Sequence, residues 1–270
     1  METRTFLSST GSSLSGLEWE GQGEGAYLLV HGLSSNARTW IELATALAAT
    51  GASVLAVDQR SHGRSERTED GYDFATYAAD IAGLVSQWDR GPAVLAGQSW
   101  GGNVVVETAH LYPTGVAAVV GVDGGFITLK DRFSEWEECA RALAPPRFGA
   151  ITVDMVRSHL TAMHPDWSPV GIEGTLANFA VEADGSARPN LSYDDHMRIL
   201  RSLFDHRPSQ GLATLSMPSL AVAARPSMAD ADAVEAAGFD TVVWIEGDHD
   251  LHVQQPERIA RLIEGVSPWV

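Results

Sequence analysis

The sequence predicts an α/β protein with a mostly parallel central sheet, helices on both of its faces and an inserted helical cap. Short apolar runs rich in β-branched residues recur along the 270 residues, and stretches with helical periodicity separate them. This alternation is typical of parallel strands joined by crossover helices. It is interrupted between Val122 and Leu220, where the segments read as helices only.

The strands and their connecting helices follow from these runs. Strands are expected at residues 27–30, 54–57, 94–97, 116–122, 220–224 and 242–245. Helices are expected at 36–50, 74–88 and 102–112, because their apolar residues share one helical stripe and each stretch stops at a turn residue or proline. A helix with Pro256 in its opening turn follows the last strand.

The interruption predicts a second structural unit. We expect a core at residues 1–125 and 216–270, and a cap at 126–215 with helices near 133–143, 151–163, 170–179 and 193–204. Ser192 and Asp195 resemble a capping box that begins the last of these helices. Parallel sheets bind ligands at the carboxyl ends of their strands, so the cap is expected to cover that edge.

Composition excludes several classes of function. Eighteen basic and thirty-five acidic residues give a net charge of −17, which disfavours nucleic acid and anionic membranes as partners. Because no segment is apolar for long enough to be a secretory or membrane-spanning segment, we expect a cytoplasmic protein, monomeric or homodimeric, that acts on a small molecule. Cys139 is the only cysteine, so no intrachain disulfide can form, and we expect it to be packed in a helix.

A nucleophile motif follows the third strand. Gly97, Gln98, Ser99, Trp100 and Gly101 form a G-x-S-x-G sequence between a strand and a helix. A sharp turn would hold the serine hydroxyl out of the sheet, and the glycines remove side chains that would collide there. Ser99 is therefore the candidate nucleophile.

The loop after the first of these strands is the candidate oxyanion loop. Its residues are Val30, His31, Gly32 and Leu33. The backbone N–H groups of Leu33 and Trp100 would stabilise negative charge on a substrate oxygen. We expect His31 and Gly32 to border the substrate, with His31 holding the loop by a hydrogen bond rather than acting as a second base.

The candidate base lies after the final strand. His249 is preferred over His252 because it is nearer the strand end, whereas His252 is expected to pack or cap. A metal site built on Asp248, His249, Asp250 and His252 is the rival interpretation, but no other cluster completes a ligand set, so neither metal nor cofactor is expected.

With these motifs in order, the chain resembles the α/β-hydrolase superfamily over nearly its whole length. Asp58, Gly63 and Ser65 match a loop of that family that is generally structural, with Ser61 where glycine is usual. The resemblance implies a third catalytic residue, an acid. Its usual place holds Arg225 and Pro226, so the acid is expected to be Asp123, after the strand that follows the elbow helix, with Asp230 and Asp232 as alternatives.

Serine at the elbow favours acyl chemistry. Haloalkane dehalogenases and epoxide hydrolases of this superfamily use aspartate there, so the resemblance implies an acyl-enzyme mechanism on an ester or lactone. Amide cleavage, carbon–carbon hydrolysis, acyl transfer and cofactor-free peroxidation remain open on the same residues, as does a ligand-binding protein that has lost the chemistry.

Side chains of the cap and of the strand ends complete the predictions. Aromatic residues of the cap, among them Trp136, Phe148 and Trp167, mostly pack, while Trp136 and Trp167 are expected to contact an apolar or aromatic substrate. Three histidines are expected to be surface or capping residues: His164, His196 and His206. Three arginines near strand ends are expected to pair with acidic side chains, with a substrate carboxylate as the alternative partner: Arg60, Arg64 and Arg225.

Overall fold

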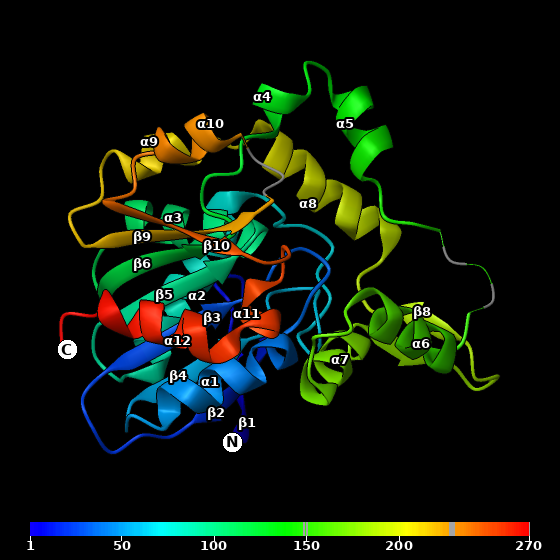
Figure 1. Ribbon diagram of the computed structural model, residues 1–270, viewed down its shortest axis with the longest axis horizontal. Coiled ribbons are helices and arrows are strands. Elements are labelled where there is room, and N and C mark those ends of the chain that lie inside the picture. Colours follow the sequence, from blue (N-terminus) through cyan, green and yellow to red (C-terminus); the bar gives the residue numbers. More distant parts are fainter. Residues whose placement is uncertain (148, 150, 227–229, 270) are drawn as a thin grey trace.

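The computed structural model describes residues 1–147, 149, 151–226 and 230–269. Within this part of the chain, eight strands form one sheet in the order β1-β2-β4-β3-β5-β6-β9-β10 (Figure 1). They are β1 (Glu2–Leu7), β2 (Ser13–Trp19), β3 (Ala26–Val30), β4 (Ser53–Val57), β5 (Ala93–Gln98), β6 (Val116–Val122), β9 (Ser219–Arg225) and β10 (Thr241–Glu246). The strands from β3 onward pair in parallel, so the predicted parallel sheet is confirmed.

Helices cover both faces of the sheet (Figure 1). On one face lie α1 (Ile41–Ala48), preceded by the short 3-10 turn η1 (Ala37–Trp40), and α12 (Pro256–Gly265); on the other lie α2 (Phe74–Trp88) and α3 (Trp100–Leu111). The central strands β3, β4 and β5 are buried throughout, because apolar clusters form on both of their faces. Two short helices flank β10: α10 (Ala231–Glu235) and α11 (Leu251–Gln254).

The N-terminal hairpin was not among the predicted strands. β1 pairs antiparallel with β2, and β2 pairs antiparallel with β4. In β1 only Phe6 is buried, so its sequence lacks the apolar run that identified the inner strands.

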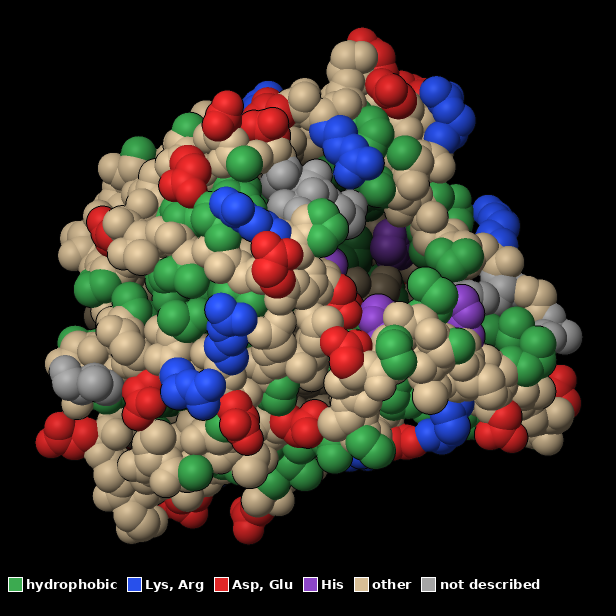
Figure 2. Space-filling model, in the orientation of Figure 1, with side chains coloured by type: hydrophobic (Ala, Val, Ile, Leu, Met, Phe, Trp, Pro, Cys, Tyr) green, Lys and Arg blue, Asp and Glu red, His purple; other side chains and the backbone are tan. Residues whose placement is uncertain are grey.

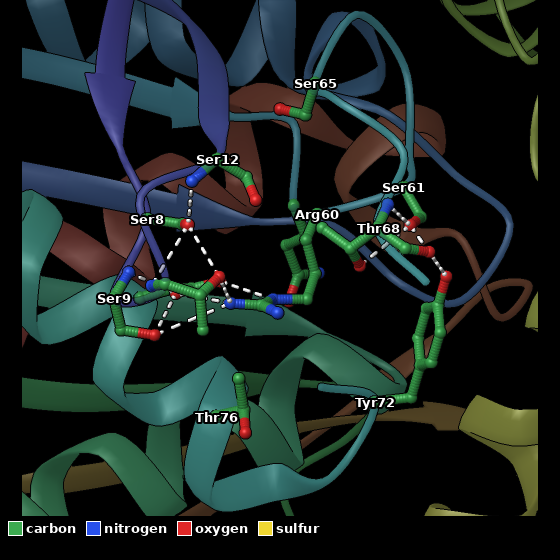
Figure 3. A network of polar contacts seen from close by, with 12 residues as sticks. Ser8, Ser9, Ser12, Arg60, Ser61, Ser65, Thr68, Tyr72 and Thr76 are labelled. Atoms are coloured by element: carbon green, nitrogen blue, oxygen red, sulfur yellow. Dashed lines mark hydrogen bonds and ion pairs between the residues drawn. The ribbon is translucent and has the colours of Figure 1, made fainter. Parts of the chain in front are cut away.

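A buried ion pair attaches this hairpin to the core. Arg60 forms two hydrogen bonds with Asp80, at 2.7 and 2.8 Å, and both side chains are almost fully buried. Asp80 also accepts the backbone N–H and hydroxyl of Ser9, and Figure 3 shows the β1–β2 turn lying beside Arg60. Arg60 therefore pairs with an acidic side chain, as expected.

The segment between β6 and β9 contains more than the expected helices. Its helices are α4 (Leu129–Arg132), α5 (Trp136–Leu143), α6 (Val153–Met163), α7 (Pro169–Leu176), α8 (Tyr193–Asp205) and α9 (Pro208–Leu212). A hairpin of β7 (Phe179–Val181) and β8 (Ala187–Pro189) replaces the end of the helix expected at 170–179. With three residues in each strand, this hairpin offers too little alternation to be recognised from the sequence.

This segment lies beyond the carboxyl ends of the parallel strands, with α8 running along that edge (Figure 1). Ser192 accepts the Asp195 backbone N–H at the start of α8, which is the expected cap. Phe148 lies outside the described residues. No helix in the described ranges combines the length and apolar character that crossing a bilayer requires.

Candidate active site

Ser99 occupies a strained turn between β5 and α3. Its backbone has φ 52° and ψ −124°, in the positive-φ region that non-glycine residues rarely adopt. The chain packs so closely here that a Cβ on Gly97 would lie 2.1 Å from the Gly101 carbonyl oxygen. A Cβ on Gly124 would lie equally close to the carbonyl oxygen of Ser99 itself. The glycines of the motif, and one after β6, therefore make room for the turn that presents Ser99.

Asp123 and His249 form a hydrogen-bonded pair. The Nδ1 of His249 lies 2.6 Å from Oδ2 of Asp123, while Oδ1 of Asp123 accepts the backbone N–H of Ala224 in β9 at 2.9 Å. Asp123 is 4% exposed and directly follows β6 with φ 42°. The carboxylate is thus held on both oxygens, one by the sheet and one by the imidazole.

Electrostatics around His249 favour its cation. Burial disfavours the charged imidazole, but the hydrogen bond to Asp123 and the carboxylates of Asp250, Asp123 and Asp248 outweigh it, so the pKa of His249 is raised. Its carbonyl oxygen accepts the side-chain N–H of Gln98 at 3.2 Å, which ties the histidine loop to the residue before Ser99. A base with this environment can accept a proton and have the resulting charge stabilised.

The alternative acids lie elsewhere. Asp230 accepts the Ala233 backbone N–H at 3.1 Å and begins α10, although it also borders the cavity described below. Asp232 lies within the first turn of that helix and is exposed. Of the three aspartates, Asp123 is the one hydrogen-bonded to His249.

Ser99, Asp123 and His249 border one cavity of about 840 Å³. Leu33 and Trp100, the expected oxyanion donors, also line it. Most of the remaining lining is apolar and comes from the inserted segment: Phe126, Ile127, Leu129, Leu143, Leu200 and Leu203. Figure 2 shows this face hollowed where α8 meets the core, with histidine side chains at the rim.

The structure places His31 and Gly32 behind the cavity wall rather than in it. His31 is fully buried; its Nδ1 donates to the Gly32 carbonyl at 2.7 Å and its Nε2 accepts the Gln59 backbone N–H at 3.1 Å. Burial lowers the pKa of His31 to about 4, so it stays neutral. A Cβ on Gly32 would lie 2.2 Å from Gln98 Oε1. Both residues shape the loop and are not among the described residues that line the cavity. Their contact with a substrate stays a prediction.

Trp136 and Trp167 also lie away from the described cavity wall. Trp136 packs against Phe204, with ring centroids 5.8 Å apart. Trp167 donates its indole N–H to Asp248 at 3.0 Å and stacks on His164. The two tryptophans therefore hold the inserted segment together and attach it to the histidine loop. Their contact with a substrate stays a prediction.

His252 and the loop after β4 have structural roles. His252 is 1% exposed, lies 4.3 Å from the Trp40 ring centroid, and burial lowers its pKa to about 3. Asp58 accepts the backbone N–H groups of Ala37 and Arg64, so it holds two loops together. No three His, Cys, Asp or Glu side chains of the described residues are grouped as a metal site.

The cavity lining includes residues that the sequence did not identify, among them a histidine of α8. His196, expected at the surface, lines the cavity and contacts the oxyanion loop through Ser34. The signal was present, because His196, Leu200 and Leu203 are spaced four and three residues apart and therefore share one face of α8.

Comparison with known proteins gives the same fold. Residues 26–150 match the family model described as alpha/beta hydrolase fold. A 2-(acetamidomethylene)succinate hydrolase of Mesorhizobium japonicum is 42% identical over 96 residues, which cover 36% of this chain and 34% of that protein. Epoxide hydrolase A of Mycobacterium tuberculosis is 34% identical over 44% of this chain and 38% of its own length. These matches thus span little more than a third of the curated relatives.

Structural similarity extends over the whole chain. The crystal structure of an E-2-(acetamidomethylene)succinate hydrolase superposes with a TM-score of 0.80, 26% identity and 98% coverage of both chains. The strand order, the elbow at Ser99 and these matches agree. The chain therefore has the α/β-hydrolase fold, and its residues 26–150 match the model of that family.

Proposed function

We propose that this protein is a serine hydrolase that cleaves a carboxylic ester or lactone through an acyl-enzyme intermediate. The observation that carries the proposal is the 2.6 Å contact between His249 Nδ1 and Asp123 Oδ2 beside the cavity that Ser99 borders. A structural histidine would not need a buried carboxylate on one side and an open cavity with a hydroxyl on the other.

The proposed reaction uses each of these groups. Nε2 of His249 takes the hydroxyl proton of Ser99 as its Oγ bonds to the substrate carbonyl carbon, and Asp123 stabilises the imidazolium. The imidazolium then gives that proton to the leaving oxygen as the carbon–oxygen bond breaks. Water, activated by the same imidazole, attacks the acyl-enzyme and restores the free serine.

The oxyanion formed in each half of the reaction needs donors that are already in place. The backbone N–H groups of Leu33 and Trp100 are the proposed donors, because both residues border the cavity and Trp100 begins α3. A helix N-terminus adds favourable electrostatics for negative charge.

The cavity supports a mostly apolar substrate of small to medium size. Its volume of about 840 Å³ falls in the range of small-molecule sites, and its lining is rich in leucine, isoleucine and phenylalanine. Arg132 and Ser209 border it as polar groups that could orient a substrate.

An amide is the second candidate substrate class. One structural match that covers 98% of both chains is to a hydrolase whose named substrate, 2-(acetamidomethylene)succinate, carries an acetamido group. The same residues would serve, with His249 protonating a leaving nitrogen in place of an oxygen.

Labelling with a fluorophosphonate probe and intact-mass measurement tests the proposal. We expect one covalent adduct on the wild type and none on Ser99→Ala, which should fold equally well. A panel of esters, lactones, amides and diketones then assigns the class. A wild-type serine that resists the probe, with tight ligand binding retained, would instead identify a binding protein.

A further inference from the structure

The turn that carries the expected oxyanion donor has an unusual residue at its third position. Ser35 donates its backbone N–H to the Gly32 carbonyl at 3.2 Å, which closes a turn over Gly32, Leu33, Ser34 and Ser35. Ser34 adopts φ 62°, a conformation that favours glycine. A serine stays there only when its surroundings hold it, so the contacts of Ser34 determine where the neighbouring Leu33 N–H points.

Two histidines hold Ser34 from opposite parts of the chain. Its backbone N–H donates to Nε2 of His62 at 3.3 Å, and its hydroxyl lies 2.7 Å from Nδ1 of His196. His62 belongs to the core: it is 1% exposed, and its Nδ1 donates to the Arg60 carbonyl at 3.0 Å. His196 belongs to α8 in the inserted segment.

The start of α8 is itself anchored to the core, so His196 is not free to swing away. Asp195, 1% exposed, forms an ion pair with Arg67, with 2.7 Å between Oδ2 and Nε. Arg198 donates to the Glu69 carbonyl at 2.8 Å. These contacts flank His196 in sequence and fix its distance from the oxyanion loop.

His196 also lines two cavities. It lines the 840 Å³ cavity with Leu33, and it lines a second cavity of about 1370 Å³ with Ser34. Burial lowers the pKa of His196 to about 4, so near pH 7 it is neutral and meets Ser34 as a hydrogen-bonding partner rather than as a charge.

We propose that His196 is a positioning residue for the oxyanion hole, which through its hydrogen bond to Ser34 holds the turn that aims the Leu33 N–H at the substrate oxygen. The inserted segment thereby completes the reaction site instead of only enclosing it. This inference rests on the proposed serine hydrolase function.

Paired substitutions at position 196 test it. His196→Leu removes the hydrogen bond to Ser34 at similar volume, together with the hydrogen bond that the imidazole makes to the Leu143 backbone, and His196→Asn keeps a polar atom near the position of Nδ1. With a chromogenic ester we expect His196→Leu to lower kcat by about tenfold to a hundredfold with KM nearly unchanged, because a displaced donor acts mainly on the transition state. Binding of a trifluoromethyl ketone, which forms an oxyanion, should weaken by the same factor, and His196→Asn should restore both.

Ser34→Gly provides the matched background. Glycine adopts a positive φ unaided, so His196→Leu should have little further effect on kcat when Ser34 is already glycine. Ser34→Ala removes the hydroxyl group of the hydrogen bond between Ser34 and His196. It serves as the test variant if His196→Leu fails to fold.

The outcomes separate the two proposals. Three results would overturn the positioning role: equal kcat in wild type and His196→Leu, a change confined to KM, or the same loss of kcat when His196→Leu is made in the Ser34→Gly background. In each case, labelling of the wild type by fluorophosphonate would still uphold the hydrolase. Absence of labelling in the wild type would overturn the hydrolase proposal itself.

Discussion

Asp123 accepts hydrogen bonds on both carboxylate oxygens, and this makes Asp123→Asn a specific perturbation of His249. The Ala224 N–H at 2.9 Å can only be satisfied by an oxygen, so the side-chain oxygen of the asparagine must stay there. Its NH₂ then faces His249 Nδ1, which must become an acceptor. The proton moves to Nε2, the nitrogen that should receive the hydroxyl proton of Ser99.

The expected loss is large, while the fold should survive. An imidazole held in the wrong tautomer lowers kcat by about 10³–10⁴-fold, which corresponds to about 4–5.5 kcal/mol of transition-state stabilisation. Asparagine tolerates the positive φ of position 123 as well as aspartate does, so the thermal midpoint should change little. Steady-state hydrolysis of the best ester in the panel, with circular dichroism as a folding control, measures both.

Two further variants complete the design. Asp230→Asn and Asp232→Asn change the alternative acids in the same way, and each should retain turnover within a few-fold of the wild type. If Asp123→Asn keeps near-normal turnover while either of the others loses it, the assignment of the acid is refuted.

Three other predictions follow from the geometry. Because the neutral imidazole is the active form and the pKa of His249 is raised, kcat/KM should fall as pH drops through a midpoint above 6.5; a midpoint well below that value would contradict the role of its carboxylate neighbours. Arg60→Met leaves Asp80 buried without its cation, so urea unfolding should show a loss of about 3–5 kcal/mol with activity per folded molecule retained, whereas a loss below about 1 kcal/mol would refute the argument. Gly124→Ala should lower both the thermal midpoint and kcat, because its methyl group would collide with the backbone of the nucleophile.

The inner part of the fold was predictable because its signal is local. Strands β3 to β6 and β9 are largely buried and therefore appear as continuous apolar runs. The edge strand β10 is only partly buried, but residues 242–245 still form an apolar run. The edge strand β1 and the hairpin β7–β8 were missed because their residues are mostly exposed or partly exposed. Tertiary pairing rather than local pattern makes these segments strands.

The site was predictable to the extent that its residues follow strand ends. Ser99, Asp123 and His249 each lie directly after or near the carboxyl end of a parallel strand, so the topology brings them to one edge of the sheet. His196 comes from the inserted segment, and its approach to Ser34 depends on how α8 packs over that edge. The helical spacing places His196 on the same face of α8 as Leu200 and Leu203, but nothing local in the sequence specifies which residues that face meets, and Ser34 lies 162 positions away.

The N-terminal hairpin has a consequence for solution behaviour. β2 covers the outer hydrogen-bonding side of β4, a strand whose five residues are all buried. The new edge is β1, whose first four residues, including Glu2 and Arg4, are exposed and polar. Charged edge strands discourage other chains from adding to a sheet. Removal of residues 1–19 would present the apolar β4 to solvent as an open edge, so a shortened chain should self-associate even though every residue bordering the 840 Å³ cavity is retained.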